Sequence, residues 1–190
     1  MPSPQQGVRL AAAANGMVYA IGGDIGAFSG GTKTRMYNPG ANSWTTMADM
    51  PTARSHPAVA AVGANIYVIG GYQSQQSMDV YDTVGNTWTT KAYPFAANIP
   101  PSFGGFAAVM NSKIYFVPGM PSGGGLVGSE PSVSRDVWEF DPATGGWTRM
   151  LPTQFAHGFG CGAAIGSKLY VLGGLDGSNA VSSMEEATLQ

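Results

Sequence analysis

One pattern recurs four times along the 190 residues of the chain. Each copy is a short apolar run that contains a tyrosine and ends in glycine. The copies are MVYAIGG (17–23), NIYVIGG (65–71), KIYFVPG (113–119) and KLYVLGG (168–174). Their tyrosines are about 48, 48 and 55 residues apart. A repeat of this length indicates one supersecondary unit stacked on copies of itself, because a single unit cannot bury both of its faces.

Each copy predicts four short strands. A run of small residues precedes the tyrosine run, and turns such as NG or GAN join the two as a tight hairpin. After the glycines an aromatic residue is followed seven positions later by tryptophan, as in Tyr81 and Trp88. We expect the small-residue strand nearest a shared axis and the glycine pair at a sharp turn or close backbone approach. We expect Tyr81 and Trp88 to fill the gap to the next unit.

A double glycine after an apolar strand, followed by spaced Tyr and Trp, resembles the kelch repeat. The resemblance covers essentially the whole chain, with departures at Pro118 and Phe140 in the third copy. It implies an all-β fold, a kelch-type β-propeller of four-stranded antiparallel blades. One propeller region is expected over 1–190. Its expected blades are 1–50, 51–95, 96–150 and a truncated blade at 151–190.

The fourth copy is shorter than the others. Ala187 occupies its aromatic column, and the sequence stops at Gln190 before the tryptophan column. Kelch propellers close with five to seven blades, so the resemblance favours an incomplete arc and a fragment of a longer chain. A self-completing oligomer and a closed four-bladed ring are the alternatives. Open blade edges predict self-association.

Composition excludes several classes of partner. Charged residues make up 11% of the chain, the net charge is −2, and no Lys/Arg cluster occurs, which argues against nucleic acid. No apolar run is long enough for membrane insertion, and no signal peptide is recognised. The single cysteine, Cys161, excludes an intrachain disulfide and is expected to be a small buried hydrophobe in an innermost strand. Cytoplasmic and bacterial secreted locations both stay open.

The candidate binding residues come from the repeat alignment and the kelch resemblance. Arg54 and His157 share one column, two positions ahead of His56, just before the innermost strand and near one mouth of the channel. In kelch proteins, ligands contact this region and the loops between second and third strands. The expected binding residues are Gln6, Arg54, His56, Ser102, Phe103 and His157, with Glu130 and Arg135 from the long loop 120–136. The competing interpretation is that Arg54 and His56 only satisfy backbone carbonyls between blades.

No catalytic, metal or cofactor site is expected. The two histidines, His56 and His157, come without a third metal ligand at a recognisable spacing. Galactose-oxidase-like copper chemistry has no identifiable ligand set here. The GGGLVG run at 123–128 precedes a strand-like segment rather than a helix, which disfavours phosphate binding. Glu185 and Glu186 are adjacent, so a strand points them to opposite faces.

A repeat scaffold without a catalytic constellation predicts a binding module for a protein or a glycan. The alternative is a carbohydrate-active enzyme of the sialic-acid mutarotase or epimerase type, since some bacterial kelch propellers act on sugars in the channel. Its acid–base group would be His56 or His157, assisted by Arg54.

Overall fold

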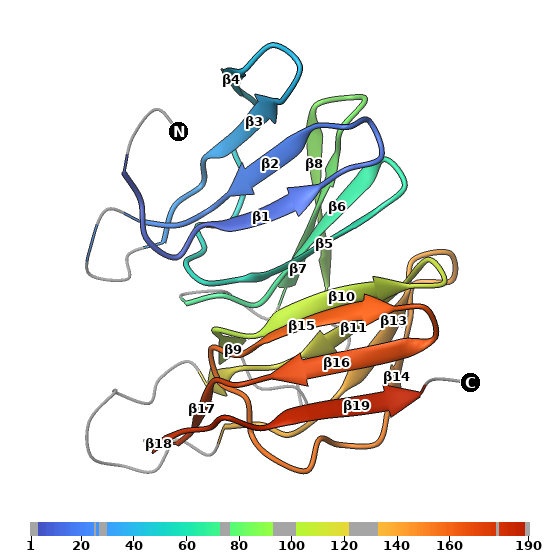
Figure 1. The fold of residues 1–190 in the computed structure, drawn as a ribbon. Coiled ribbons are helices and arrows are strands. Elements are labelled where there is room, and N and C mark those ends of the chain that lie inside the picture. The colour runs from blue at the N-terminus through green and yellow to red at the C-terminus, as the bar shows by residue number, and fades with distance from the viewer. Residues whose placement is uncertain are drawn as a thin grey trace.

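The computed structural model describes residues 4–24, 26, 30–72, 77–92, 102–121, 133–177 and 179–188. This part of the chain is built from β-strands and turns, and none of its elements is a helix that could cross a membrane. The strands form four main antiparallel sheets in sequence order, which we call blades 1 to 4 (Figure 1).

Blades 1 to 3 each have four strands. Blade 1 contains β1 (Arg9–Ala12), β2 (Val18–Ile21), β3 (Thr34–Asn38) and β4 (Ser43–Thr46). Blade 2 contains β5 (Ala58–Val62), β6 (Asn65–Ile69), β7 (Ser77–Asp82) and β8 (Thr87–Ala92). Blade 3 contains β10 (Phe106–Met110), β11 (Lys113–Val117), β13 (Trp138–Asp141) and β14 (Gly146–Arg149).

Blade 4 has three described strands, β15 (Cys161–Ile165), β16 (Lys168–Leu172) and β19 (Met184–Thr188). Two short ribbons are separate from the main sheets. One pairs β9 (Ser102–Phe103), which precedes β10, with β12 (Met120–Pro121), which follows β11, and the other pairs β17 (Leu175–Asp176) with β18 (Asn179–Ala180) between β16 and β19. The expected meander of four antiparallel strands is confirmed in blades 1 to 3.

The innermost strands surround a common axis. β1 packs against β5, β5 against β10, and β10 against β15. β1 and β15 lie at the two ends of this series (Figure 1). The arrangement is a four-bladed β-propeller, and blades 1 and 4 each have one face that no other described blade covers.

Aromatic pairs fill the layers between blades with one repeated geometry. Tyr19 of blade 1 meets Tyr81 of blade 2 at 5.7 Å between ring centroids and an interplanar angle of 59°. Tyr67 of blade 2 meets Phe140 of blade 3 at the same distance and angle. The equal geometry shows that the repeat in sequence is also a repeat in packing.

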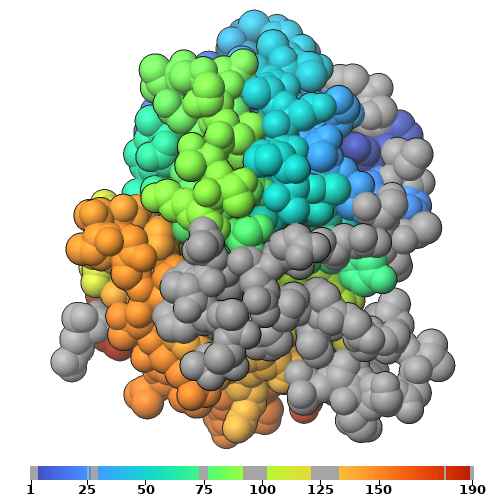
Figure 2. All heavy atoms as spheres, turned by 180° about the vertical axis from the view of Figure 1, so that it is seen from behind, coloured from blue at the N-terminus to red at the C-terminus, as the bar shows by residue number. Residues whose placement is uncertain are grey.

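The prediction that Tyr81 and Trp88 pack against the next blade is wrong. Both side chains pack against blade 1, the preceding blade, and the indole N–H of Trp88 donates to the carbonyl of Ala48 at 2.9 Å. Figure 2 shows the residues of β8 directly against those that follow β4. Side chains alternate across a blade, so Tyr67 on β6 takes the face toward the next blade and Tyr81, opposite Ile66, takes the other.

The buried role expected for Cys161 is also wrong. Its side chain is exposed, because it lies on the uncovered face of blade 4. The equivalent residue of blade 2, Ala58, is buried against blade 3. The same strand position is therefore buried in blade 2, where blade 3 packs on it, and exposed in blade 4, where no other described blade does.

The double glycine after β6 behaves as expected. Gly70 and Gly71 have φ values of 66° and 100°. A Cβ on Gly70 would lie 2.5 Å from the carbonyl oxygen of Ser102, and the amide of Gly71 donates to that oxygen at 2.7 Å. The glycines therefore let the end of β6 touch the backbone of the next blade.

Candidate ligand-binding site at the channel mouth

A ladder of backbone hydrogen bonds runs around one end of the channel. The amide of His56 donates to the carbonyl of Gly7 at 2.8 Å, Gly104 to His56 at 2.9 Å, and Phe159 to Gly104 at 2.8 Å. Each of the four residues lies shortly before the innermost strand of its own blade. We call Gly7, His56, Gly104 and Phe159 the mouth ladder.

All four ladder residues have a left-handed backbone. Their φ values are 66° and 69° for Gly7 and Gly104, and 53° and 57° for His56 and Phe159. A residue with a Cβ loses about 1–2 kcal/mol in this conformation. Blades 2 and 4 nevertheless place side chains there, and the two rings meet edge to face at 5.5 Å. Strain of this kind concentrates at functional sites, which marks the mouth as the candidate site.

Asp24, Ser55 and His56 form a row of hydrogen-bonded polar side chains, which we call the row. The hydroxyl of Ser55 donates to Oδ2 of Asp24 at 2.5 Å, and Nδ1 of His56 lies 2.8 Å from the same hydroxyl oxygen. Because the Ser55 proton is used on Asp24, Nδ1 of His56 carries the proton that it donates to Ser55. Asp24 also accepts from Nε2 of Gln6 and from the amide of Gly26, both at 2.9 Å.

These contacts set the charges of the row. Burial alone would raise the pKa of Asp24, but the hydrogen bonds from Ser55, Gln6 and Gly26 outweigh it and lower that pKa. The pKa of His56 is lowered by burial and by the positive charge of Arg9, against a smaller opposing effect of Asp24. At pH 7 the row therefore consists of a carboxylate and a neutral imidazole.

Arg9 brings a positive charge to the channel. It is partly buried, and that burial lowers its pKa. Together with Phe159 and the starts of the innermost strands it lines a hollow of about 430 Å³. Among the described residues no carboxylate forms an ion pair with Arg9. A guanidinium in this position can donate two parallel hydrogen bonds to one carboxylate.

Comparison with known proteins agrees with the repeat. The model for the KLHDC2/KLHL20/DRC7 Kelch-repeats domain matches residues 1–174. The chain belongs to the kelch-repeat family. Its repeat, glycines and spaced aromatics are thus kelch features, as the sequence resemblance implied.

Curated relatives carry the kelch repeat in longer chains. Kelch-like protein 15 of Homo sapiens is 28% identical over 183 residues, which cover 85% of this chain and 28% of that protein. Kelch-like protein 25 of Xenopus tropicalis is 31% identical over 132 residues, covering 67% and 22%. Alpha-scruin of Limulus polyphemus is 29% identical over 185 residues, covering 92% and 19%. The chain spans less than a third of the length of these relatives.

A solved structure supports the fold. The structure of YjhT superposes with a TM-score of 0.73 and 18% identity, covering 98% of this chain and 66% of that chain. At this identity the likeness concerns the fold alone.

Arg54 and His157, expected near the mouth, are fully buried beneath it. Nε of Arg54 donates to Asp79 at 3.0 Å, and Nε2 of His157 lies 2.8 Å from Oε1 of Glu185. Each carboxylate stands two positions before the aromatic column of its kelch repeat. In blade 1, Gln5 stands at the position of Arg54 and His157, and Arg35 stands at the position of the carboxylate. Nη1 of Arg35 donates to Oε1 of Gln5. The pairs tie the segment before the innermost strand to the third strand, and ligand contact through Arg54 or His157 stays a prediction.

The remaining candidate binding residues differ in burial and in the groups they contact. Gln6 is exposed and bonded to Asp24, while Ser102 is buried and its carbonyl meets Gly71. Phe103 is buried and contacts the rings of Tyr72 at 5.3 Å and Phe159 at 5.5 Å. Arg135 is exposed and donates to the carbonyl of Gln154 at 3.2 Å. Glu130, like the GGGLVG run, lies outside the described residues.

Sequence reasoning missed Arg9, Asp24 and Phe159. Arg9 had a usable signal, because it is the only charged residue in the four innermost strands. Asp24 directly follows a double glycine and pairs with Gln6 as Tyr72 pairs with Ser55. Phe159 stands where two other kelch copies have glycine. In the described ranges no group of three His, Cys, Asp or Glu side chains could hold a metal ion.

Proposed function

We propose that this kelch propeller is a binding module that takes an acidic segment of a protein partner at the mouth of its channel. The observation that carries the proposal is Arg9, a partly buried guanidinium that lines a hollow of about 430 Å³ and has no carboxylate partner in the described chain. A carboxylate from a partner would supply the missing charge and form hydrogen bonds in place of those to water.

The surroundings of Arg9 suit a protein ligand. Phe159 lines the hollow beside Arg9, and the ring of His56 meets it edge to face. The buried ring of Phe103 packs against Phe159 and supports it from the core. Aromatic residues and arginine are the types enriched at protein interfaces, where they make the energetically dominant contacts. We expect Gln6, bonded to Asp24, and His56, bonded to Ser55, to contribute to the same binding surface. The kelch-like relatives support the same class of function.

The test uses two fluorescein-labelled peptides that differ only in having several glutamates or the same number of glutamines. Titration with the full chain, followed by anisotropy, should show tighter binding of the glutamate peptide and weakening as ionic strength rises. Arg9→Ala should lose at least tenfold in affinity, whereas Arg149→Ala, a change at an exposed arginine on β14, should not. Equal binding of both peptides, or an unchanged Arg9→Ala, contradicts the proposal.

A second candidate is sugar chemistry at His56. The row Asp24–Ser55–His56 favours it, because the lowered pKa of His56 leaves a neutral imidazole that could move a proton at neutral pH. Sialic acid and a panel of neutral sugars would be followed by NMR for mutarotation and epimerisation. The candidate requires turnover that His56→Ala abolishes, and absence of turnover across the panel removes it for those substrates.

A further inference from the structure

His157 lies in the segment before β15, and each of its ring nitrogens faces a hydrogen-bond acceptor. Its side chain is fully buried. Nδ1 lies 2.7 Å from the carbonyl oxygen of Gly173, and Nε2 lies 2.8 Å from Oε1 of Glu185. A backbone carbonyl and a carboxylate can only accept, so each nitrogen must carry a proton to make its bond. The two contacts together therefore require the charged imidazolium form.

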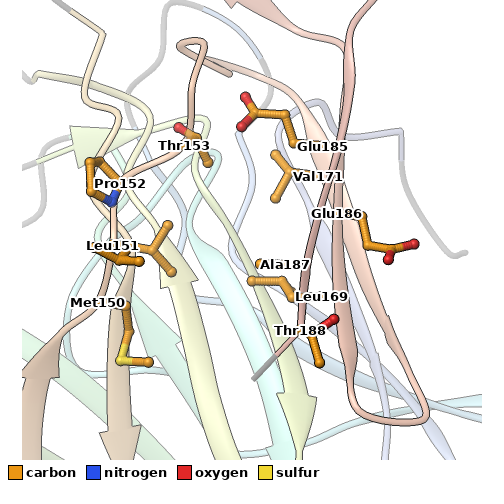
Figure 3. Close-up of a pocket in the computed structure, with 11 residues that line it drawn as sticks. Met150, Leu151, Pro152, Thr153, Leu169, Val171, Glu185, Glu186, Ala187 and Thr188 are labelled. Carbon is orange, nitrogen blue, oxygen red and sulfur yellow. The ribbon is translucent and has the colours of Figure 1, made fainter. Parts of the chain in front are cut away.

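Glu185 is the ionised member of the pair. Its Oε2 accepts from the amide of Gln154 at 2.5 Å and its Oε1 from the amide of Phe155 at 2.8 Å. At the cavity drawn in Figure 3, its carboxylate is directed toward the segment that begins at Thr153. Burial raises the pKa of Glu185, but the bonds from Gln154, His157 and Phe155 outweigh burial and lower that pKa. At neutral pH the proton between the two side chains therefore belongs to the imidazole.

Blade 2 makes the same two contacts with an arginine. Nε of Arg54 donates to Asp79 at 3.0 Å, and its Nη1 donates to the carbonyl of Gly70 at 2.6 Å. Gly70 and Gly173 are each the first glycine of a pair, and Asp79 and Glu185 share a column of the repeat. A guanidinium keeps its charge throughout the ordinary pH range, whereas an imidazole changes its charge between about pH 5 and 8. Of these two equivalent ties, the one in blade 4 is therefore the one that a proton can switch.

The surroundings of His157 offer no second cation to replace its charge. Glu185 of β19 is the charged side chain that faces the ring, and the segment after β16 presents the carbonyl of Gly173. Arg135, from the segment before β13, donates to the carbonyl of Gln154. In the described ranges no other ion pair involves His157 or Glu185. Loss of the proton therefore leaves one buried acceptor facing a nitrogen lone pair, which costs the charge-assisted bond.

The tie at His157 fastens the segment that carries Phe159 to the rest of blade 4. The next residue, Gly158, exchanges two backbone hydrogen bonds with Leu175, at 3.0 Å from its own amide and at 2.6 Å from the amide of Leu175. Phe159 follows as a member of the mouth ladder, and it lines the hollow beside Arg9. A change of charge at His157 therefore acts on β19 and on one wall of the channel mouth together.

We propose that His157 is a proton-operated lock on blade 4. With its proton bound, the imidazolium fastens Glu185 of β19 and the carbonyl of Gly173 to the segment that carries Phe159. As the pH rises and the proton passes to solvent, one ring nitrogen no longer donates, and this segment loosens together with the adjoining wall of the mouth. Blade 2 stays fastened, because the charge of Arg54 is permanent. The lock does not depend on what binds at the mouth.

NMR of the unsubstituted chain tests the charge directly, because the chain has only two histidines. In the full chain labelled with 15N, His157 should show at pH 7 the two similar nitrogen shifts of an imidazolium. His56 serves as the neutral reference, since burial and the charge of Arg9 lower its pKa. His56→Ala assigns the remaining ring to His157. A neutral ring at position 157 at pH 7 overturns the proposal.

Hydrogen exchange at two equivalent amides measures the release. Leu175 donates to the carbonyl of Gly158 in blade 4, as Tyr72 donates to that of Ser55 in blade 2. Between about pH 6 and about pH 9, a range that extends above the ordinary titration of an imidazole, the protection factor of Leu175 should fall at least tenfold further than that of Tyr72. Protection factors already correct for the faster intrinsic exchange at high pH. An equal change at the two amides contradicts the lock.

His157→Arg gives blade 4 the residue that blade 2 uses. Its permanent charge should remove the extra pH dependence at Leu175, so that the two amides change alike. Lys168→Arg is the matched control, because Lys168 forms an exposed ion pair with Glu186 in the same blade and should leave that dependence in place. A folded His157→Arg chain that keeps the full dependence overturns the proposal. If His157→Arg does not fold, the NMR and exchange measurements on the unsubstituted chain still decide it.

Discussion

Arg54 and Asp79 form an ion pair in which neither side chain is exposed to solvent, with Nε and Oδ2 3.0 Å apart. The same guanidinium donates to the carbonyl of Gly70 at 2.6 Å and to the carbonyl and hydroxyl of Ser77 at 3.0 and 2.9 Å. One side chain therefore joins the segment before β5 to the end of β6 and the start of β7. The buried charges are tolerated because they are paired and hydrogen-bonded to their surroundings.

Asp79→Ala is expected to lower the free energy of unfolding by about 3–5 kcal/mol, because it leaves the buried guanidinium without its carboxylate. Urea denaturation of the purified chain measures the change. Asp49→Ala is the matched control, since the Lys33–Asp49 pair has the short separation of 2.7 Å but is about half exposed. It should cost about 1 kcal/mol or less. Similar losses in the two variants would contradict this account.

The fold could be predicted because it depends on local and repeated features. The glycine pair, the small-residue strand and the aromatic columns recur in register, and each copy folds into the sheet its pattern indicates. The column shared by Arg54 and His157 was also visible in the sequence. Their partners were not, because Asp79 and Glu185 lie 25 and 28 residues away and belong to a different strand.

The sequence does not show which face of each blade is covered by a neighbouring blade. Tyr67 and Tyr81 sit on adjacent strands and face opposite blades, and only the sheet register decides which. The exposure of Cys161 likewise depends on which face of blade 4 another described blade covers, and its strand pattern alone does not show this. At the mouth, the Asp24–Ser55–His56 row joins residues from two blades. No spacing within one segment of the sequence could therefore predict it.

Gly70→Ala should destabilise the chain by clearly more than Gly63→Ala. Both glycines have a left-handed backbone, with φ values of 66° and 59°. A Cβ at position 63 meets nothing within 4 Å, so the change costs only the conformational penalty of about 1–2 kcal/mol. At position 70 the Cβ would lie 2.5 Å from the carbonyl of Ser102 and force blades 2 and 3 apart. Thermal unfolding of both variants measures the difference, and equal losses would show that blade spacing is not rigid here.

Trp88→Phe tests the hydrogen bond between blades 1 and 2 separately from ring packing. The change keeps an aromatic ring beside Tyr81 but removes the N–H that donates to Ala48. The free energy of unfolding should fall by about 1–2 kcal/mol, since the carbonyl loses its partner and the ring is smaller. Trp44→Phe is the control, because Trp44 stacks on Tyr37 at the uncovered face of blade 1. Its loss should be less than half as large by urea denaturation.

His56→Gly and His56→Ala separate backbone strain from the contacts of the imidazole. Both variants lose the bond to Ser55 and the contact with Phe159. Glycine removes the strain of a φ of 53°, whereas alanine retains it, so the glycine variant should be more stable than the alanine variant by about 1 kcal/mol. The order reverses at an ordinary helix or strand position, where glycine is the less stable residue. Urea denaturation that finds alanine equal or better would contradict the strain.

Glu185 should make stability depend on pH in the acid range. Burial would raise its pKa, but the hydrogen bonds from the amide of Gln154, from His157 and from the amide of Phe155 outweigh it and lower that pKa below the ordinary value of 4.5. The carboxylate therefore stabilises the fold fully above about pH 4.5, and this contribution is lost as the pH falls through the lower folded pKa. Glu185→Gln cannot titrate and should cost about 1–3 kcal/mol at pH 7.

The measurement is the free energy of unfolding of both chains between pH 7 and about pH 3, a range that spans the titration of a carboxylate. The gap between the parent and Glu185→Gln should narrow as the pH falls, because protonation removes from the parent what the variant already lacks. Glu186→Gln is the control, because Glu186 lies on the opposite face of β19 (Figure 3) and forms a solvent-exposed ion pair with Lys168. Its free energy of unfolding should differ less from that of the parent at every pH. A Glu185→Gln gap that stays constant with pH would show that the carboxylate charge is not what holds β19 to the segment around His157.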